Sequence, residues 1–468
     1  MQTSLTEIDS LVMFTNNQGR HGRGTLIHIS RTSALFEVYN PYSILQLSEV
    51  LSDLLIIRGE REIYKGRAVV NNIVSTGIML IVTVTLTDTW LDLHGLRPGG
   101  VLKSETERFI NDLMESHKLN PAYQIAVNNI RNFLGELNKW LDEAEIDAGL
   151  RSDKMNSDDM IEAYFEEIRP PVVPRLTELF SQFEDEASRI QDTEIMKHKA
   201  FARRSLHPLI LCSPFAHRAY MKPLGFAGDY EMVNMMLKLS IVKPRSIYAR
   251  IIDIFHVEAS APAAHRGRIK MMLDRLTNEA ERVITGNERI FSVINIGCGP
   301  ALEVQEFISV NPLANQTSIH LVDFNEETID YAKIRIDDLI ATRGNKPIVR
   351  YLIKSIDDLL REAHLKYNTN TQSYDMVYCA GLFDYFSNQI CRRLVELFYT
   401  WLRPGGLLTV TNVDPCNPNR YQMEHLLEWN LIYRDENDMK ELSPKNAEYR
   451  IYKDKTNVNV FLDIRKPE

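Results

Sequence analysis

The stretch from Phe291 to Pro300 constrains the fold of this chain more than any other. It reads Phe-Ser-Val-Ile-Asn-Ile followed by Gly-Cys-Gly-Pro. The first six residues are mostly apolar and several are β-branched, which predicts a buried strand. The glycines predict a tight turn at which the backbone approaches a neighbour closely. The apolar run from Ile319 to Val322 predicts a second buried strand, and it ends on the carboxylate of Asp323.

In a βαβ unit, an acidic residue at the end of the second strand lies beside the glycine turn and accepts hydrogen bonds from a ribose. This turn lacks the third glycine that leaves room for a pyrophosphate at the helix N-terminus. The pattern therefore favours a ligand with a ribose but no phosphate over a dinucleotide. The turn residues are Gly297, Cys298, Gly299 and Pro300.

These features resemble the cofactor-binding half of class I S-adenosylmethionine-dependent methyltransferases, over about residues 290 to 468. The resemblance implies S-adenosyl-L-methionine as cofactor and a Rossmann-like, seven-stranded α/β domain. After a third predicted strand, Asp357 is implied as the acceptor of the adenine amine, although it also fits a helix N-cap. A fourth predicted strand, 374–379, leads into residues that would face the transferring methyl group. The implied cofactor-binding residues are Gly297, Cys298, Gly299, Pro300, Asp323, Phe324, Asp357, Ala380 and Gly381.

The C-terminal sequence supports the same topology. Residues 449–453 and 458–465 predict two strands joined by a short polar turn. A terminal antiparallel hairpin is the usual end of this methyltransferase architecture, whereas a dinucleotide dehydrogenase continues with further βα units. The hairpin therefore strengthens the cofactor prediction.

Bulk properties limit the classes of protein that remain. The length of 468 residues predicts two to four domains, and the net charge of −9 argues against a dedicated nucleic-acid binder. The five cysteines include no CxxC pair, so neither a disulfide framework nor a metal site is predicted. We find no signal-peptide pattern and no apolar run long enough to span a membrane. We therefore expect a cytoplasmic protein.

The N-terminal part of the chain predicts a small β-barrel or β-sandwich, because short apolar runs alternate with Gly, Asn and Ser. It resembles a PilZ-type barrel, a family that often binds cyclic di-GMP. Arg20 and Arg23 could supply the arginines of that family's leader. Ser30 stands at the serine position, but His28 and Ser33 replace the acidic or amide residue and the glycine. The resemblance implies a degenerate PilZ-like domain with cyclic di-GMP as a candidate partner.

The central part of the chain has apolar residues at helical spacing. One seam predicts a long amphipathic helix and consists of Ile130, Leu134, Leu137 and Leu141. Packing within a helical bundle explains this seam better than a dimeric coiled coil, because it spans fewer than three or four heptads. A homodimer is left open. A turn between helices is predicted at Pro170, Pro171 and Pro174.

The segment 207–231 follows neither the helical nor the strand period. It is rich in Gly, Tyr, Asp and Lys, which fits both a structural loop and a site built on a rigid scaffold. Its run Lys-Pro-Leu-Gly-Phe-Ala-Gly-Asp-Tyr-Glu resembles a segment of bacterial proteins identified as extracellular-factor, or 3-hydroxypalmitic acid methyl ester, biosynthesis methyltransferases. Phe226 replaces the usual tyrosine. Two further runs, 379–385 and 428–434, are similar to segments of that group.

This resemblance implies a small or lipid-like carboxylic acid as methyl acceptor, such as a 3-hydroxy fatty acid used to make a signal molecule. A carboxylate is ionised at neutral pH and needs no general base. A hydroxyl or amine acceptor would need one, and the candidates are His207, His265 and Asp384. Two alternatives stay open. One is a methyltransferase for another metabolite or a protein, and the other is a cyclic-dinucleotide-responsive signalling adaptor whose methyltransferase-like half only binds ligand.

The predicted architecture is therefore multidomain. Residues 1–100 are expected to form the barrel, 101–250 a helical linker or cap, and 251–468 the methyltransferase domain. The predicted substrate-binding residues are Tyr220, Lys222, Gly228, Asp229, Tyr230 and Arg266. The predicted catalytic residues are Asp384, Tyr385 and His265.

Overall fold

The computed structural model divides into two compact units, and both are discontinuous in sequence. The first contains residues 1–227, 241–256 and 419–430, and the second contains residues 228–240, 257–418 and 431–468. The structure describes residues 10–30, 32–38, 45–58, 61–75, 79–88, 118–150, 157–239, 244, 246–287, 289–364 and 372–468, with single positions between 103 and 110. The expected boundary between residues 100 and 101 lies outside the described residues. None of the described helices is long and apolar enough to cross a membrane.

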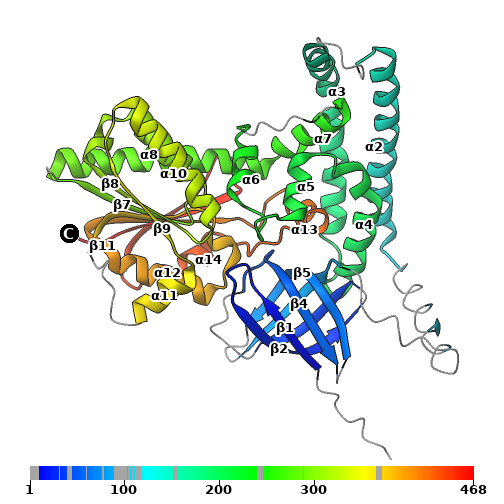
Figure 1. Cartoon of the computed structure of the whole chain (residues 1–468), viewed down its shortest axis with the longest axis horizontal. Helices are drawn as coiled ribbons and strands as arrows, with labels where there is room; N and C mark the ends of the chain where they lie inside the picture. Colours follow the sequence, from blue (N-terminus) through cyan, green and yellow to red (C-terminus); the bar gives the residue numbers. More distant parts are fainter. Residues whose placement is uncertain are drawn as a thin grey trace, which may run out of the picture. The chain divides into compact units, whose positions relative to one another are not determined.

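Six antiparallel strands of the first unit close into a barrel in the order β1-β2-β3-β6-β5-β4. Figure 1 shows this barrel in blue. Alternate side chains of each strand point inwards, so Phe14, Phe36 and Tyr64 are buried. The prediction of a small N-terminal barrel is confirmed, whereas its PilZ-like identity and its binding of cyclic di-GMP stay predictions. The strands are β1 (Ser10–Thr15), β2 (His21–Ile29), β3 (Ser33–Val38), β4 (Val50–Arg58), β5 (Arg61–Ser75) and β6 (Leu80–Leu86).

Helices form most of the remaining described residues of the first unit. The predicted seam is buried on α2, where Ile130, Leu134 and Leu141 face α3 and α4. The expectation of an α-helical central region is confirmed. The helices are α2 (Pro121–Asp147), α3 (Ser157–Ala187), α4 (Ile195–Ile210), α5 (Pro214–Met221) and α13 (Arg420–Leu426), together with most of α7 (Ile247–Val257).

The prediction of a turn at the three prolines is wrong. Pro170, Pro171 and Pro174 lie inside the continuous helix α3. A proline in a helix leaves the carbonyl four residues earlier without its N–H partner. Residues 166, 167 and 170, which carry these carbonyls, are exposed, so water can serve as the partner. Phe165 and Leu176 are buried on the other face and hold the helix against its neighbours.

The second unit is built on a mixed seven-stranded sheet of order β12-β13-β11-β10-β7-β8-β9. The strands β7 to β11 run parallel, while β13 is antiparallel to β11 and β12 is antiparallel to β13. The predicted α/β sheet and its terminal hairpin are confirmed. The strands are β7 (Phe291–Ile296), β8 (Thr317–Asp323), β9 (Ile348–Ile353), β10 (Tyr374–Cys379), β11 (Leu402–Val413), β12 (Glu448–Lys453) and β13 (Asn459–Arg465).

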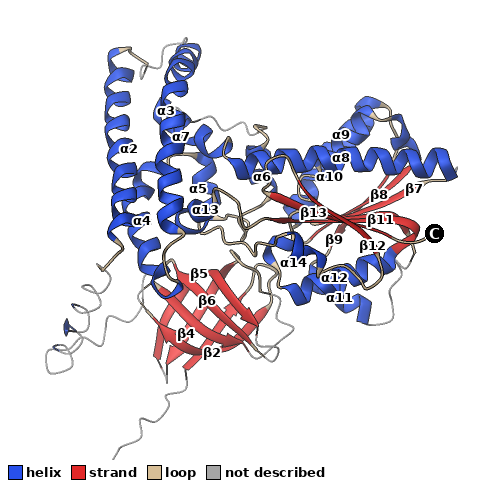
Figure 2. Cartoon of the chain, turned by 180° about the vertical axis from the view of Figure 1, so that it is seen from behind, coloured by secondary structure: helices blue, strands red, loops and turns tan. Residues whose placement is uncertain are grey.

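Helices cover both faces of this sheet (Figure 2). On one face lie α8 (Ser260–Asn287), α9 (Leu302–Val310) and α10 (Glu326–Arg343), and on the other lie α11 (Ile356–His364) and α12 (Asn388–Trp401). Because the central strands are covered on both faces, β7 and β10 read as nearly continuous apolar runs. The unit also contains α6 (Tyr230–Met236) and α14 (Glu436–Lys440).

Candidate functional site

The candidate site lies at the carboxyl ends of the parallel strands, where the strand order reverses. The chain runs from β7 outwards to β8 and β9, and then returns to the other side of β7 with β10. Ligands of open α/β sheets bind at such a reversal. The loops that follow these four strands therefore form the site.

The loop after β7 turns on two glycines with positive φ, Gly297 at 68° and Gly299 at 53°. The N–H groups of Gly297 and Cys298 donate to the carbonyl of Val322 at 2.8 and 3.0 Å, which fixes the loop to the end of β8. A Cβ added to Gly297 would lie 3.3 Å from Leu382, whereas a Cβ added to Gly299 would meet no atom within 4 Å. The backbone at Gly299 therefore borders open space in which a ligand can lie.

Asp323 closes β8 beside this loop and is buried. Its Oδ2 accepts the N–H of Gly299 at 3.2 Å, and its Oδ1 accepts the N–H of Asn325 at 3.1 Å. Burial raises the pKa of Asp323 to about 6, although these backbone N–H groups oppose the shift. Each carboxylate oxygen has two lone pairs, so both can still accept a hydroxyl proton. The side chain is fixed in place and remains able to bind a vicinal diol.

The loop after β9 brings in a second buried carboxylate. Asp357 lies in the first turn of α11 and pairs with Nε of Arg361 at 2.9 Å. The N–H of Lys354 donates to the carbonyl of Asp323 at 2.9 Å, which ties the loops after β8 and β9 together. Phe324, which is partly buried, follows Asp323. Two carboxylates and an aromatic ring thus follow adjacent strands, an arrangement suited to a nucleoside.

Asp384 is the buried carboxylate of the loop after β10 and lies in the short helix η3 (Phe383–Tyr385). Its Oδ1 accepts the N–H of Val413 at 2.7 Å. Burial raises the pKa of Asp384 to about 6, and the positive charges of Arg268 and Arg434 oppose the shift. Such a carboxylate can accept a proton near neutral pH. The partly exposed residues of this loop include Ala380, Gly381 and Tyr385.

A buried arginine that the sequence did not single out lies beside this loop. Arg268 of α8 is 8% exposed, and an added Cβ on Gly381 would lie 2.7 Å from its Nη2. Among the described residues, no carboxylate lies within ion-pair distance of this guanidinium, although the charges of Asp384 and Glu303 act on it from farther away. The site therefore contains a buried cation that is able to receive an anionic group.

His265 is the hydrogen-bond partner of that guanidinium. Nη2 of Arg268 donates to Nδ1 of His265 at 2.6 Å. Because arginine has no acceptor, Nδ1 is unprotonated and the neutral ring carries its proton on Nε2. Burial lowers the pKa of His265 well below its usual value, and the charges of Arg268 and Arg266 lower it further. The predicted catalytic histidine is thus arranged as a donor through Nε2 at neutral pH.

Arg266, two residues earlier on the same helix, has different partners. Its Nη1 donates to the carbonyl of Met236 at 2.7 Å and to that of Val257 at 2.9 Å, at the ends of α6 and α7. Side chains two residues apart on a helix point to nearly opposite sides. The structure therefore brings Arg268 to the loop after β10, whereas Arg266 joins two helix ends.

A further buried carboxylate follows the glycine loop and was also missed in the sequence. Oε1 of Glu303, in the first turn of α9, accepts the hydroxyl of Tyr378 at 2.7 Å and Nδ2 of Asn295 at 3.0 Å. Burial raises the pKa of Glu303, and the hydrogen bond from Tyr378 opposes the shift. This network joins β7 to β10 at the strand reversal. Its signal in the sequence is the presence of polar Asn295 and Tyr378 within two apolar strands.

The predicted substrate-binding residues are divided between the two units. Tyr220 and Lys222 belong to the first unit, whereas Gly228, Asp229, Tyr230 and Arg266 belong to the second. Lys222 is 1% exposed, and its Nζ donates to the carbonyl of Leu427 at 3.0 Å. Burial lowers the pKa of Lys222 to about 7. Lys222 is therefore part of the interior of the first unit.

Tyr230 is brought to the helix that follows Asp323. Its hydroxyl donates to Oε1 of Glu327 in the first turn of α10 at 2.8 Å, and its ring centroid lies 4.6 Å from that of Tyr331. Oδ1 of Asp229 accepts the N–H of Met232 at 2.9 Å and caps α6. The structure thus places Tyr230 near the start of α10, with Asp229 fixing the helix that carries it.

Residues 293–406 match a family model described as a methyltransferase domain. This match includes the four loops described above, from Gly297 to the residues after β10. No curated protein matches the sequence.

Several solved structures are similar to parts of this chain. A possible exported protein from Bordetella parapertussis is 15% identical, covers 54% of this chain and 86% of its own, and has a TM-score of 0.40. The N-methyltransferase NodS from Bradyrhizobium japonicum WM9, in complex with S-adenosyl-L-homocysteine, is 14% identical, covers 42% of this chain and 87% of its own, and has a TM-score of 0.28. Magnesium protoporphyrin IX methyltransferase from Synechocystis PCC 6803, with bound SAH, is 14% identical, covers 43% of this chain and 84% of its own, and has a TM-score of 0.31. At these values, the substrates of those proteins do not transfer to this chain.

Proposed function

We propose that this S-adenosylmethionine-dependent methyltransferase transfers its methyl group to the carboxylate of a small or lipid-like acid of the 3-hydroxy fatty acid type. The observation that carries the proposal is the buried guanidinium of Arg268 beside Gly381, for which the described residues provide no ion-pair partner. An acceptor carboxylate would supply an ion-pair partner at contact distance. The chain-like part of the acceptor is supported by the resemblance of residues 222–231 to the extracellular-factor group.

The site fits the cofactor. Open space borders Gly299, and Asp323 keeps lone pairs for a ribose diol. Asp357 follows the next strand, where it would accept the adenine amine, with Phe324 against the ring. When bound, the cofactor supplies a methyl group activated on a sulfonium, which ends on an acceptor oxygen and leaves a neutral thioether.

A carboxylate acceptor requires little of the protein. It is ionised at neutral pH, so its oxygen reacts without a general base. Arg268 already donates to His265, and its remaining N–H groups would hold one carboxylate oxygen and leave the second free to react. Alignment of reacting groups lowers a barrier by about 7–11 kcal/mol in favourable intramolecular cases. We therefore assign Arg268 an orienting role toward the acceptor.

A hydroxyl or amine acceptor is the second candidate, and Asp384 favours it. With its pKa raised to about 6 by burial, this carboxylate is ionised at pH 7 and can take a proton from the acceptor. Nδ1 of His265 is occupied by Arg268. For such an acceptor, Asp384 would be the general base.

The test uses cofactor with a labelled methyl group and a panel of acceptors: 3-hydroxy fatty acids of several lengths, short hydroxy acids, amines and alcohols. We expect labelled methyl esters that hydroxylamine cleaves, formed by the Asp384→Asn variant as well. A product that resists hydroxylamine, combined with a loss of about 10²–10⁴-fold in Asp384→Asn, would contradict the carboxylate proposal and support the general-base alternative.

A further inference from the structure

Two segments that resemble the extracellular-factor group carry the chain from the first unit into the second. The boundary falls between Ala227 and Gly228 in one segment, and between Asn430 and Leu431 in the other. Within the first unit, both segments are anchored by one short stretch, residues 48–50, at the start of β4. The function proposed above does not explain these anchors.

Ser48 holds the second segment through its hydroxyl. Its Oγ accepts the N–H of Asn430 at 2.6 Å and lies 3.0 Å from each of the carbonyls of Glu428 and Asn430, to which its proton can be donated. The N–H of Ser48 donates to the carbonyl of Val70 in β5 at 2.8 Å, so this serine is fixed to the barrel. Ser48 is also fully buried, so these bonds are shielded from water.

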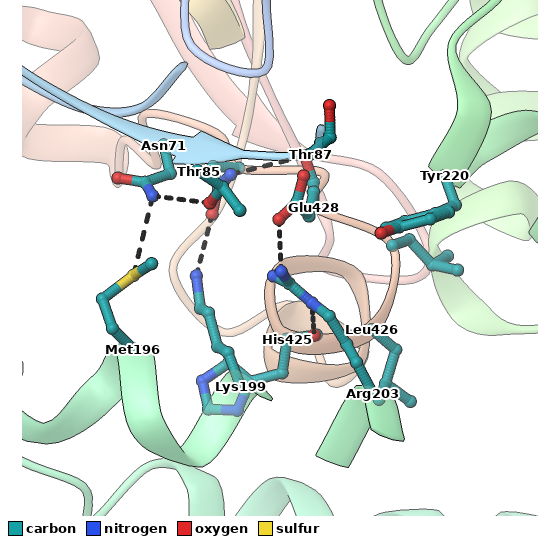
Figure 3. Close-up of polar contacts among 12 residues, drawn as sticks. Asn71, Thr85, Thr87, Met196, Lys199, Arg203, Tyr220, His425, Leu426 and Glu428 are labelled. Carbon is teal, nitrogen blue, oxygen red and sulfur yellow. Dashed lines mark hydrogen bonds and ion pairs between the residues drawn. The ribbon is translucent and has the colours of Figure 1, made fainter. Parts of the chain in front are cut away.

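Side chains of α4 hold the same segment, as Figure 3 shows. Arg203 forms an ion pair with Glu428 and donates through Nε to the carbonyl of His425 at 2.7 Å. Nζ of Lys199 donates to Oδ1 of Asn430 at 3.1 Å. Glu428 is buried and has φ of 51°, a backbone conformation that residues other than glycine rarely adopt. Several bonds therefore hold this segment in one conformation.

The neighbours of Ser48 hold the first segment. The N–H of Val50 donates to the carbonyl of Gly225 at 2.8 Å. Between Ser48 and Val50, the fully buried carboxylate of Glu49 accepts the N–H groups of Asn17 at 2.9 Å and Gln46 at 2.8 Å. Buried hydrogen bonds therefore hold this stretch of the barrel where both segments attach.

Within the second unit, the continuation of the second segment holds the loop after β10. The N–H of Ile432 donates to the carbonyl of Asp384 at 2.7 Å. The guanidinium of Arg434 is buried and donates to the carbonyls of Phe383 at 2.8 Å and Phe386 at 2.5 Å, on either side of Asp384. This segment thus fixes the backbone of the loop that carries Asp384.

The chain between the two anchors is short. The N–H of Asn430 is bonded to Ser48, and the N–H of Ile432 is bonded to Asp384, so the two anchored N–H groups are two residues apart. Two residues span at most about 7 Å, so the chain between the anchors is short. We therefore expect that release of Asn430 from Ser48 loosens the chain at Ile432.

We infer that Ser48 is a positioning residue for methyl transfer: by fixing residues 428–430 it restrains the chain that continues into Ile432 and Arg434, and these two residues hold the backbone of the loop after β10. The inference rests on the methyl-transfer function proposed above but not on the identity of the acceptor. A misplacement of about 1 Å can cost about 10²-fold in rate.

Ser48→Ala tests this inference. Ser48 has φ of 62°, which is equally unfavourable for serine and alanine, so the substitution changes only the hydroxyl. We expect kcat to fall about tenfold at unchanged affinity for S-adenosylhomocysteine. Amide hydrogen exchange should accelerate about tenfold at residues 383–386 and 431–434, and stay unchanged at 320–325. The matched control is Tyr64→Phe, which removes another barrel hydroxyl, bonded to the carbonyl of Arg67 at 2.5 Å, and should leave these readouts unchanged.

Unchanged exchange at residues 383–386 in folded Ser48→Ala would overturn the inference. Equal acceleration in Tyr64→Phe would also overturn it, because that result would indicate general destabilisation of the barrel. If Ser48→Ala does not fold, Ser48→Cys keeps the volume with weaker hydrogen bonds, and the same readouts decide. If no acceptor is methylated by the wild type, the proposed function fails, while the exchange measurement still decides whether Ser48 restrains the loop after β10.

Discussion

Replacement of Arg268 by methionine tests the proposed acceptor site. The guanidinium is 8% exposed and lies against Gly381, and methionine fills a similar volume without the charge. A hydrogen bond to a charged group contributes about 1.5–3 kcal/mol, which corresponds to a change of about 10- to 150-fold in affinity. We therefore expect Arg268→Met to raise KM for the acid by about this factor, with little change in the dissociation constant of S-adenosylhomocysteine.

The same substitution should shift the pH dependence. Arg268 opposes the burial that raises the pKa of Asp384 to about 6, so removal of this charge raises that pKa further. If Asp384 must be ionised, the acidic limb of the rate profile moves to higher pH in Arg268→Met. Arg268→Lys is the matched control, because it keeps the charge but loses the planar arrangement of donors. It should keep the pH profile and lose part of the acceptor affinity.

Gly381→Ala should imitate Arg268→Met. An added Cβ would lie 2.7 Å from Nη2 of Arg268, and Gly381 has φ of 98°, so alanine displaces the guanidinium and strains the loop. Because both changes act on one group, their effects on KM should not add in the double variant. Steady-state kinetics give KM for the acceptor, and calorimetric titration gives the dissociation constant of S-adenosylhomocysteine. Weakened binding of this product with unchanged KM for the acceptor would refute the reasoning and assign Arg268 to the carboxylate of the cofactor.

Three further predictions concern the first unit. Arg203→Met leaves the buried carboxylate of Glu428 without its ion-pair partner, so the free energy of unfolding measured in urea should fall by about 3–5 kcal/mol. A fall of less than about 1 kcal/mol would show that the pair is hydrated. Burial lowers the pKa of Lys222 to about 7, so between pH 7 and 10 the unfolded chain binds more protons than the folded chain, and the stability of the wild type rises with pH. The stability of Lys222→Met should rise less over this range. An equal rise would contradict the lowered pKa of Lys222. Burial raises the pKa of Glu49 to about 7, so the wild type loses part of its stability as pH rises from 4.5 to 7. Thermal unfolding of Glu49→Gln should not show this loss. An identical pH dependence in both proteins would exclude Glu49 as the source of the loss.

The strands of the second unit could be predicted because parallel strands covered on both faces are continuous apolar runs, and each ends where its polar residues begin. The sequence therefore placed Gly297, Asp323 and Asp357 on neighbouring loops. It could not tell which of Arg266 and Arg268 reaches the loop after β10, because that depends on the rotation of α8. The tautomer of His265 follows only from its partner.

The division of the chain into units was also beyond local patterns. Asn430 belongs to the first unit because its N–H bonds to Ser48, which is 382 residues away in the sequence. The prolines of α3 failed as turn signals because their unpaired carbonyls are on exposed residues. Each of these outcomes depends on long-range packing or solvent exposure, which residue spacing does not encode.

The most direct measurement of the central claim is calorimetric titration of the wild type and Asp323→Asn with S-adenosylhomocysteine. The account predicts one binding site per chain, an affinity that declines as pH falls through about 6, where Asp323 becomes protonated, and about 10- to 150-fold weaker binding by Asp323→Asn. Folded wild-type protein that does not bind this compound, or equal binding by Asp323→Asn, would contradict the claim that the loops after β7 and β8 hold the adenosyl group.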